Sequence, residues 1–154
     1  MQLNKLILNN FRNYKYQEID LINGINFFEG NNAQGKTNII ESIYMCAFGK
    51  SYRTTKEFCR INLKYKKNDI ESNIEVYIDK NNKKQLKKDG VKITRLSNHV
   101  GELPLVIFSP DSLNIVKGAP SKRRTFIDII YSQLSKSYLI NLQEYNKCLK
   151  IKNI

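Results

Sequence analysis

The chain has 154 residues and a formal net charge of +12, with 26 Lys and Arg against 14 Asp and Glu. This length allows one domain with a sizeable hydrophobic core and is too short for two domains of ordinary size. The basic excess favours a polyanionic partner such as nucleic acid, and no apolar run approaches the length of a membrane span.

The cysteines and the lone histidine give no sign of a metal site or a disulfide framework. Cys46, Cys59 and Cys148 are widely spaced and form no Cys-x-x-Cys pair, and His99 has no Cys or His at ligand spacing. Met1 leads directly into a polar, alternating segment without an apolar signal region. We therefore expect a cytoplasmic protein in a reducing compartment, with no membrane association.

The first 28 residues predict three strands, over residues 2–8, 16–21 and 25–28. Asn-rich turns and the pair Asn23-Gly24 separate them. A helix is predicted over residues 37–45, and Gly49 is placed to terminate it. The third strand and this helix flank a glycine-containing loop, so strand, loop and helix follow one another directly.

That loop fits the Walker A pattern G-x-x-x-x-G-K-[ST] at every fixed position, with the residues Gly30, Asn31, Asn32, Ala33, Gln34, Gly35, Lys36 and Thr37. Glycine at both ends lets the backbone turn tightly and bring its N–H groups against a polyphosphate. Lys36 supplies a charge to the β- and γ-phosphates, and Thr37 offers its hydroxyl to Mg²⁺. We expect an ATP site over residues 30–38, Asn38 included. A turn that matches by chance is the alternative, which the flanking strand and helix disfavour.

A second group of strands is predicted over residues 60–64, 70–78, 85–88 and 91–93, with hairpin turns at 80–82 and 89–90. Basic residues gather here with only Asp89 opposing them: Lys80, Lys83, Lys84, Lys87, Lys88, Lys92 and Arg95. Two interpretations stay open. The lysines either keep a solvated edge strand from aggregating or contact a phosphate backbone.

The last third of the chain predicts one short strand, over residues 105–108, and then helices. Ser109-Pro110-Asp111 suits a helix start. From Arg123 onward apolar residues recur at steps of three and four, as in long amphipathic helices that need a partner surface. The seven-residue step of Tyr131, Tyr138 and Tyr145 favours a packing stripe over base stacking. The chain stops inside this helical pattern, so we expect it to be cut short.

No second buried strand ends in the acid that would polarise an attacking water and complete Mg²⁺ coordination. Residues 76–79 come nearest, but Lys80 follows Asp79 and a turn begins there, while Asp128 lies on a helix face. A signature segment resembling L-S-x-G-Q is also missing. We therefore expect this chain to hold ATP and to hydrolyse it poorly or not at all. A small phosphotransferase is the alternative function. Such an enzyme needs its own acid near Mg²⁺ and a lid rich in arginine, whereas this chain has only six arginines and no such acid.

Several segments together resemble one family, the RecF proteins of DNA replication and repair: residues 10–14, 30–37, 49–54, 108–111, 116–124 and 126–128. The resemblance covers the chain and corresponds to the N-terminal part of such proteins. It implies an α/β P-loop ATPase head of the ABC/SMC type, with a lobe of mixed and antiparallel strands (residues 1–120) and the start of a helical lobe (residues 121–154). Family members continue for about as many residues again, and the omitted part carries Walker B and the signature motif.

The resemblance also implies partners and activities. The family binds ATP with Mg²⁺ and binds DNA, is a weak DNA-dependent ATPase, and dimerises around ATP at full length. It works with RecO and RecR mediator proteins in recombinational repair and the SOS response, helping to load recombinase at single-strand gaps. A further interpretation is that a chain this short is only a remnant of a longer protein, which folds or interacts without the activity of the family.

Two arginines outside the loop are candidate nucleotide contacts by this resemblance. Arg12 matches a position near the nucleotide in related heads, and its other reading is an arginine that caps a strand end. Arg53 resembles an arginine after the Walker A helix that reaches phosphates or DNA, and its other reading is an ordinary surface arginine. Arg123 and Arg124 open a helix and are expected to be solvated.

Overall fold

The computed structural model describes residues 1–51, 58–108 and 110–152. It divides into two compact units, residues 1–96 and residues 97–154, which we call the sheet unit and the helical unit. Each is described by itself. The division of function at residue 120 stays a prediction.

The sheet unit contains one six-stranded antiparallel sheet in the order β2-β1-β3-β4-β5-β6. Its strands are β1 (Gln2–Phe11), β2 (Tyr14–Asp20), β3 (Cys59–Lys67), β4 (Ile70–Ile78), β5 (Lys84–Lys88) and β6 (Val91–Lys92). The predicted strands over 2–8, 16–21, 60–64, 70–78, 85–88 and 91–93 are therefore confirmed, with shifted ends. Strands β1 and β2 pair as a hairpin, and β3 to β6 pair in chain order. Strand β3 does not pair with β2, which precedes it in the chain, but with β1.

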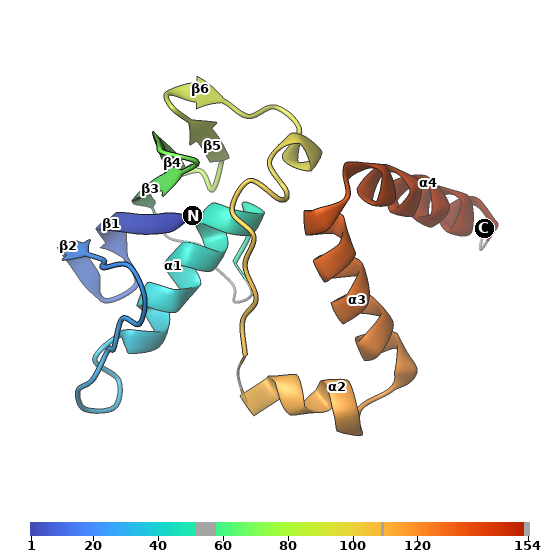
Figure 1. The fold of residues 1–154 in the computed structure, drawn as a ribbon, viewed down its shortest axis with the longest axis horizontal. Helices are drawn as coiled ribbons and strands as arrows, with labels where there is room; N and C mark the ends of the chain where they lie inside the picture. Colours follow the sequence, from blue (N-terminus) through green and yellow to red (C-terminus); the bar gives the residue numbers. More distant parts are fainter. Residues whose placement is uncertain (52–57, 109, 153–154) are drawn as a thin grey trace. The chain divides into compact units, whose positions relative to one another are not determined.

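Helix α1 (Lys36–Phe48) packs against one face of this sheet (Figure 1). The strands alternate buried and more exposed residues, as β3 shows from Cys59 to Tyr65. Leu6, Leu63 and Val76, from three neighbouring strands, are fully buried. Gly49 ends the helix as expected: its φ of 62° is left-handed, and its N–H donates to Met45 O at 2.9 Å.

The predicted strand over residues 25–28 is absent, because no described strand pairs with this segment. It runs without regular secondary structure, and Ile25 and Phe27 are 86% and 87% exposed. An extended segment becomes a strand only where a neighbour accepts its backbone hydrogen bonds, and the alternating apolar pattern cannot supply that neighbour.

The helical unit contains two short 3₁₀ turns, Leu96–Asn98 (whose first residue belongs to the sheet unit) and Pro110–Leu113, followed by α2 (Asn114–Lys117), α3 (Pro120–Leu134) and α4 (Lys136–Lys152). The helices predicted from Arg123 onward are confirmed, and Pro120 begins α3 at a position that suits proline. The Tyr138 hydroxyl donates to Asp128 at 2.6 Å and so joins α4 to α3. Ser109, the expected N-cap, lies outside the described residues.

The second missing strand, over residues 105–108, has a side chain in place of a strand partner. The Gln133 side chain accepts a hydrogen bond from the Leu105 N–H at 2.7 Å and donates to the Leu105 carbonyl at 3.2 Å. An amide that bonds both groups of one residue imitates a neighbouring strand over one residue only. Val106 and Phe108 are 67% and 82% exposed.

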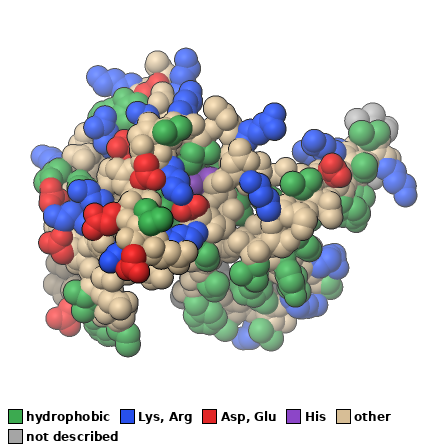
Figure 2. Space-filling model, turned by 45° about the horizontal axis from the view of Figure 1, so that its top comes forward, with side chains coloured by type: hydrophobic (Ala, Val, Ile, Leu, Met, Phe, Trp, Pro, Cys, Tyr) green, Lys and Arg blue, Asp and Glu red, His purple; other side chains and the backbone are tan. Residues whose placement is uncertain are grey.

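The apolar stripe of the two long helices is largely uncovered. Among the described side chains of α3 and α4 only Ser132 and Leu139 are buried, and hydrophobic side chains gather over the helical unit (Figure 2). This agrees with helices whose pattern calls for a partner surface. Across the described residues, no helix combines the length and apolarity needed to cross a membrane.

The burial of the cysteines predicts their reactivity. Cys46 and Cys59 are fully buried and Cys148 is exposed, and burial raises the pKa of the Cys46 thiol far above its usual range. We expect a thiol reagent to modify only Cys148 rapidly in the native protein, and all three cysteines in denaturant. Intact-mass spectrometry over time measures this. Fast labelling of Cys46 would contradict the described packing of α1 on the sheet.

Candidate nucleotide-binding site

The Walker A loop has the backbone that its glycines predict. Gly30 and Gly35 have φ angles of 140° and 104°, and Ala33 is also left-handed at 66°. A Cβ on Gly30 would collide with the Gln34 side chain. Gln34 Oε1 accepts a hydrogen bond from the Asn31 N–H at 3.0 Å, so the loop is also tied across its own turn.

The loop ends at the N-terminus of α1, which is open to an anion. No side chain caps this end, and no acidic residue lies in the first turn. Helix N-termini present N–H groups without intrahelical partners and carry a partial positive charge. A hollow of about 270 Å³ lies here, lined by Asn32, Ala33, Gly35, Lys36, Thr37 and Asn38. The structure thus brings six of the predicted residues together around a hollow suited to phosphate, whereas Gly30, Asn31, Gln34 and Arg12 are not among the residues that line it.

Lys36 reaches back over the loop. Its Nζ donates to the carbonyl oxygens of Gly30 and Asn31, each at 2.7 Å. An ammonium group has three N–H donors, so this arrangement can hold the loop closed and still offer a donor to a phosphate oxygen. A Mg²⁺-bound polyphosphate would find its partners here. Lys36 and the first N–H groups of α1 can donate to phosphate oxygens, and the Thr37 hydroxyl oxygen can bind Mg²⁺.

The turn between β1 and β2 lies against this loop. Asn13 Nδ2 donates to the Gln34 carbonyl at 2.9 Å, and Asn38 Nδ2 donates to Asn13 Oδ1 at 2.9 Å. A Cβ on Gly35 would come within 2.7 Å of the Asn13 amide and 2.9 Å of the Tyr14 hydroxyl. Glycine is therefore needed at position 35 for close packing of this turn as well as for its φ.

Arg12 binds a carboxylate inside the sheet unit. Its guanidinium donates to both oxygens of Glu41 on α1, with Nη2–Oε1 at 2.6 Å and Nε–Oε2 at 3.2 Å. The Glu41 side chain is fully buried and also accepts a hydrogen bond from the Ser51 hydroxyl. Neither sequence interpretation of Arg12 included this ion pair. A role for Arg12 beside the nucleotide stays a prediction.

The other residues singled out from the sequence have varied positions. Arg53 lies outside the described residues. The Arg123 guanidinium donates to the Gly118 carbonyl at 3.1 Å and so steadies the start of α3. His99 is buried, and the described residues contain no group of three His, Cys, Asp or Glu that could hold a metal.

The two acids weighed as catalytic groups have structural partners. Asp79 Oδ1 accepts the N–H groups of Asn81 and Lys83, both at 2.8 Å, and so shapes the turn between β4 and β5. Asp128 accepts the Tyr138 hydroxyl. Both acids therefore have a structural role in the described residues.

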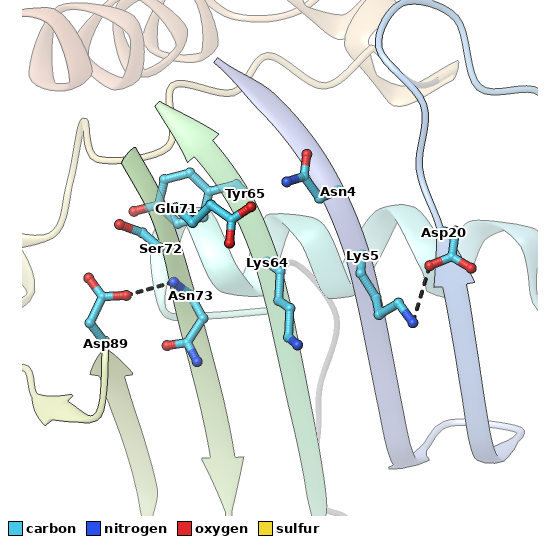
Figure 3. A pocket seen from close by; sticks show the side chains of 9 residues that line it. All are labelled: Asn4, Lys5, Asp20, Lys64, Tyr65, Glu71, Ser72, Asn73 and Asp89. Atoms are coloured by element: carbon cyan, nitrogen blue, oxygen red, sulfur yellow. Dashed lines mark hydrogen bonds and ion pairs between the residues drawn. The ribbon is translucent and has the colours of Figure 1, made fainter. Parts of the chain in front are cut away.

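A second polar hollow of about 480 Å³ lies on the sheet (Figure 3), lined by Asn4, Lys5, Asp20, Lys64, Tyr65, Glu71, Ser72, Asn73 and Asp89. Lys5 pairs with Asp20 at 3.2 Å and with Glu18 at 3.1 Å, and Asp89 accepts the Asn73 N–H at 2.7 Å. Its charges are of both signs and partly paired, and it lacks a helix N-terminus. The Walker A loop is the better candidate for polyphosphate.

Comparisons with known proteins identify the family to which this chain belongs. The family model described as "AAA domain" matches residues 5–153, and the chain belongs to this family of nucleotide-binding domains. Within it, the chain resembles the N-terminal part of RecF, the DNA replication and repair protein. It is 40% identical to RecF of Clostridium botulinum (strain Eklund 17B / Type B) over an alignment of 163 residues that covers 100% of this chain and 45% of that protein. It is 44% identical to RecF of Clostridium tetani (strain Massachusetts / E88), over an alignment that covers 100% of this chain and 44% of that protein.

Solved structures give the same result. A structure described as recombination mediator protein RecF with ATP matches with a TM-score of 0.88 and 33% identity, over 99% of this chain and 43% of that one. A structure from work on SMC ATPases matches with a TM-score of 0.66 and 20% identity, over 84% of this chain and 99% of that one, which shows the fold alone. The predicted ABC/SMC-type head fold and the resemblance to RecF are confirmed. The chain spans about 45% of the length of the curated relatives it matches.

The ion pair between Arg12 and Glu41 predicts a large effect on stability. Removing one member of a buried pair costs about 3–5 kcal/mol, because the other charge stays buried without its partner. We expect Arg12→Ala to lower the free energy of unfolding by about 3 kcal/mol, measured by urea denaturation. Lys5→Ala, which breaks the solvent-accessible ion pairs with Glu18 and Asp20 in the same sheet, is the control and should lower the free energy of unfolding far less. Equal effects of the two variants would show that the Glu41 pair is not buried in solution.

Proposed function

We propose that this chain is the nucleotide-holding N-terminal part of a RecF-type ATPase head. It binds Mg²⁺-ATP over residues 30–38 within a lobe of residues 1–120, and the helices from residue 121 begin the second lobe. The observation that supports this most is the open N-terminus of α1, with Lys36, Thr37 and the glycine-turned loop around one hollow. Arg12 and Arg53 are proposed as further contacts to the nucleotide.

The proposed setting is that of the family: recombinational repair, replication and the SOS response in the cytoplasm, with DNA and the RecO and RecR mediators as partners. ATP-dependent dimerisation belongs to the full-length proteins. Hydrolysis by this chain alone is not proposed, because Asp79, the acid that directly follows the buried strand β4, accepts two backbone hydrogen bonds in the turn that begins there.

Contact with DNA is proposed for the basic hairpin of β5 and β6. Lys83, Lys84 and Lys92 are exposed, and none of them forms an ion pair with another described residue. Within the hairpin, Lys84, Lys87, Lys88 and Lys92 are opposed in sequence only by Asp89. A run of lysines on neighbouring strands offers positive charge to a phosphate backbone.

Nucleotide binding is tested with fluorescent ATP and Mg²⁺, beside Lys36→Ala. A hydrogen bond to a charged group contributes about 1.5–3 kcal/mol, which is roughly a 10- to 100-fold change in affinity. We expect at least a tenfold loss in the variant. Phosphate release is followed in the same samples with and without DNA. Sustained release that Lys36→Ala abolishes would overturn the proposal that this chain only holds ATP, and phosphate transfer to a small acceptor would favour the phosphotransferase.

DNA binding is tested by its dependence on salt. Each lysine that contacts a phosphate adds about 0.9 to the slope of log affinity against log salt concentration. We expect Lys→Gln at positions 83, 84, 87 and 92 together to reduce this slope by about 3.6, as measured by fluorescence anisotropy. The control, with equal net charge, carries Lys→Gln at positions 136, 147, 150 and 152 of α4. Equal slopes for the two variants would show that the hairpin has no special role.

A further inference from the structure

Asn13 connects three parts of the nucleotide site through one side chain. It lies in the turn between β1 and β2 and is exposed, so it has no part in the core. Its Nδ2 donates to the Gln34 carbonyl of the loop at 2.9 Å, and its Oδ1 accepts from Asn38 in the first turn of α1 at 2.9 Å. Both ends of one amide are thus used between loop and helix.

The bond to Gln34 sets the direction of the peptide that follows. A peptide unit is planar and trans, so its N–H points opposite to its carbonyl. With the Gln34 carbonyl turned toward Asn13, the Gly35 N–H is turned away from Asn13. Gly35 also lines the hollow at the head of α1, where loop N–H groups cradle phosphate oxygens in proteins with this pattern.

The packing leaves this peptide little freedom. The Asn13 amide and the Tyr14 hydroxyl stand where a Cβ of Gly35 would be, at 2.7 and 2.9 Å. Gly35 itself has a left-handed φ of 104°. A glycine can change to another φ at little cost, so this conformation depends on the hydrogen bond from Asn13. Removing the Asn13 amide therefore removes the side-chain hydrogen bond that fixes this peptide, while the Tyr14 hydroxyl stays beside it.

We propose that Asn13 is a positioning residue for polyphosphate binding. It acts through the peptide between Gln34 and Gly35 and does not contact the nucleotide itself. This inference rests on the proposed function, since it concerns the same loop. An Asn13 that only closes the hairpin is the competing role, and it would affect stability rather than binding.

The test uses Asn13→Leu, which has nearly the same shape and charge but no hydrogen-bonding groups. We expect Mg²⁺-ATP and inorganic tripolyphosphate to bind about tenfold more weakly, since two hydrogen bonds that order the cradle are lost. The equal loss for tripolyphosphate would show that the effect is on the phosphate cradle. The matched control is Asn81→Leu, in the turn between β4 and β5, which should bind like the wild type. Asn13→Ser, too short to bridge both partners, should behave like Asn13→Leu and decides the question if that variant folds poorly.

Two readouts separate positioning from a structural role. The thermal midpoint of Asn13→Leu should stay close to that of Asn81→Leu, and amide hydrogen exchange should become faster in residues 30–35 of Asn13→Leu alone. If binding is unchanged while Lys36→Ala still abolishes it, the inference fails and the proposed function stands. If the thermal midpoint falls and the binding of the remaining folded protein is normal, Asn13 is structural. If the wild type binds no nucleotide, the proposed function fails first.

Discussion

The buried ion pair of Arg12 and Glu41 is the constraint on which the nucleotide site depends. A carboxylate at zero exposure is costly unless a charge and hydrogen bonds compensate it. The guanidinium of Arg12 supplies both, and it comes from the turn between β1 and β2. Because Glu41 lies on α1, the pair ties the end of β1 to the helix that carries the phosphate site. Arg12 accepts a left-handed φ of 57° in doing so.

Once Arg12 fixes that turn to α1, the two residues that follow it, Asn13 and Tyr14, contact the Walker A loop. Asn13 bonds Gln34 and Asn38, and Tyr14 stands over Gly35. The loop is thus held from outside by the turn and from inside by Lys36 and Gln34. An anion site made of backbone N–H groups gains from such fixing, since groups already in place need no reordering when the phosphate arrives.

The sequence predicted the parts of this unit that rest on local chemistry. The Walker A loop, the left-handed Gly49 that ends α1 and the hairpins at residues 80–82 and 89–90 all follow from residue types at short spacing. The strands over 25–28 and 105–108 were wrong, because a strand depends on a neighbour that the local pattern does not contain. The pairing of Arg12 with Glu41 was missed because 29 residues separate them. A glutamate among the apolar residues of a helix, Ile39, Ile40 and Ile43, was the available signal.

The antiparallel sheet also supports the proposal that this chain holds ATP without turning it over. Hairpins place the acids at turns and edges, where Asp79 and Asp89 bond backbone N–H groups and Asp20 pairs with Lys5. An acid that reaches the phosphates needs a strand running beside the segment that leads into the loop, so that its end lies next to Lys36. Residues 25–28 are that segment, and none of the described strands pairs with it. Binding and hydrolysis thus make different demands on the fold. The first needs a turned loop at a helix end, and the second needs a neighbouring strand that none of the described strands provides.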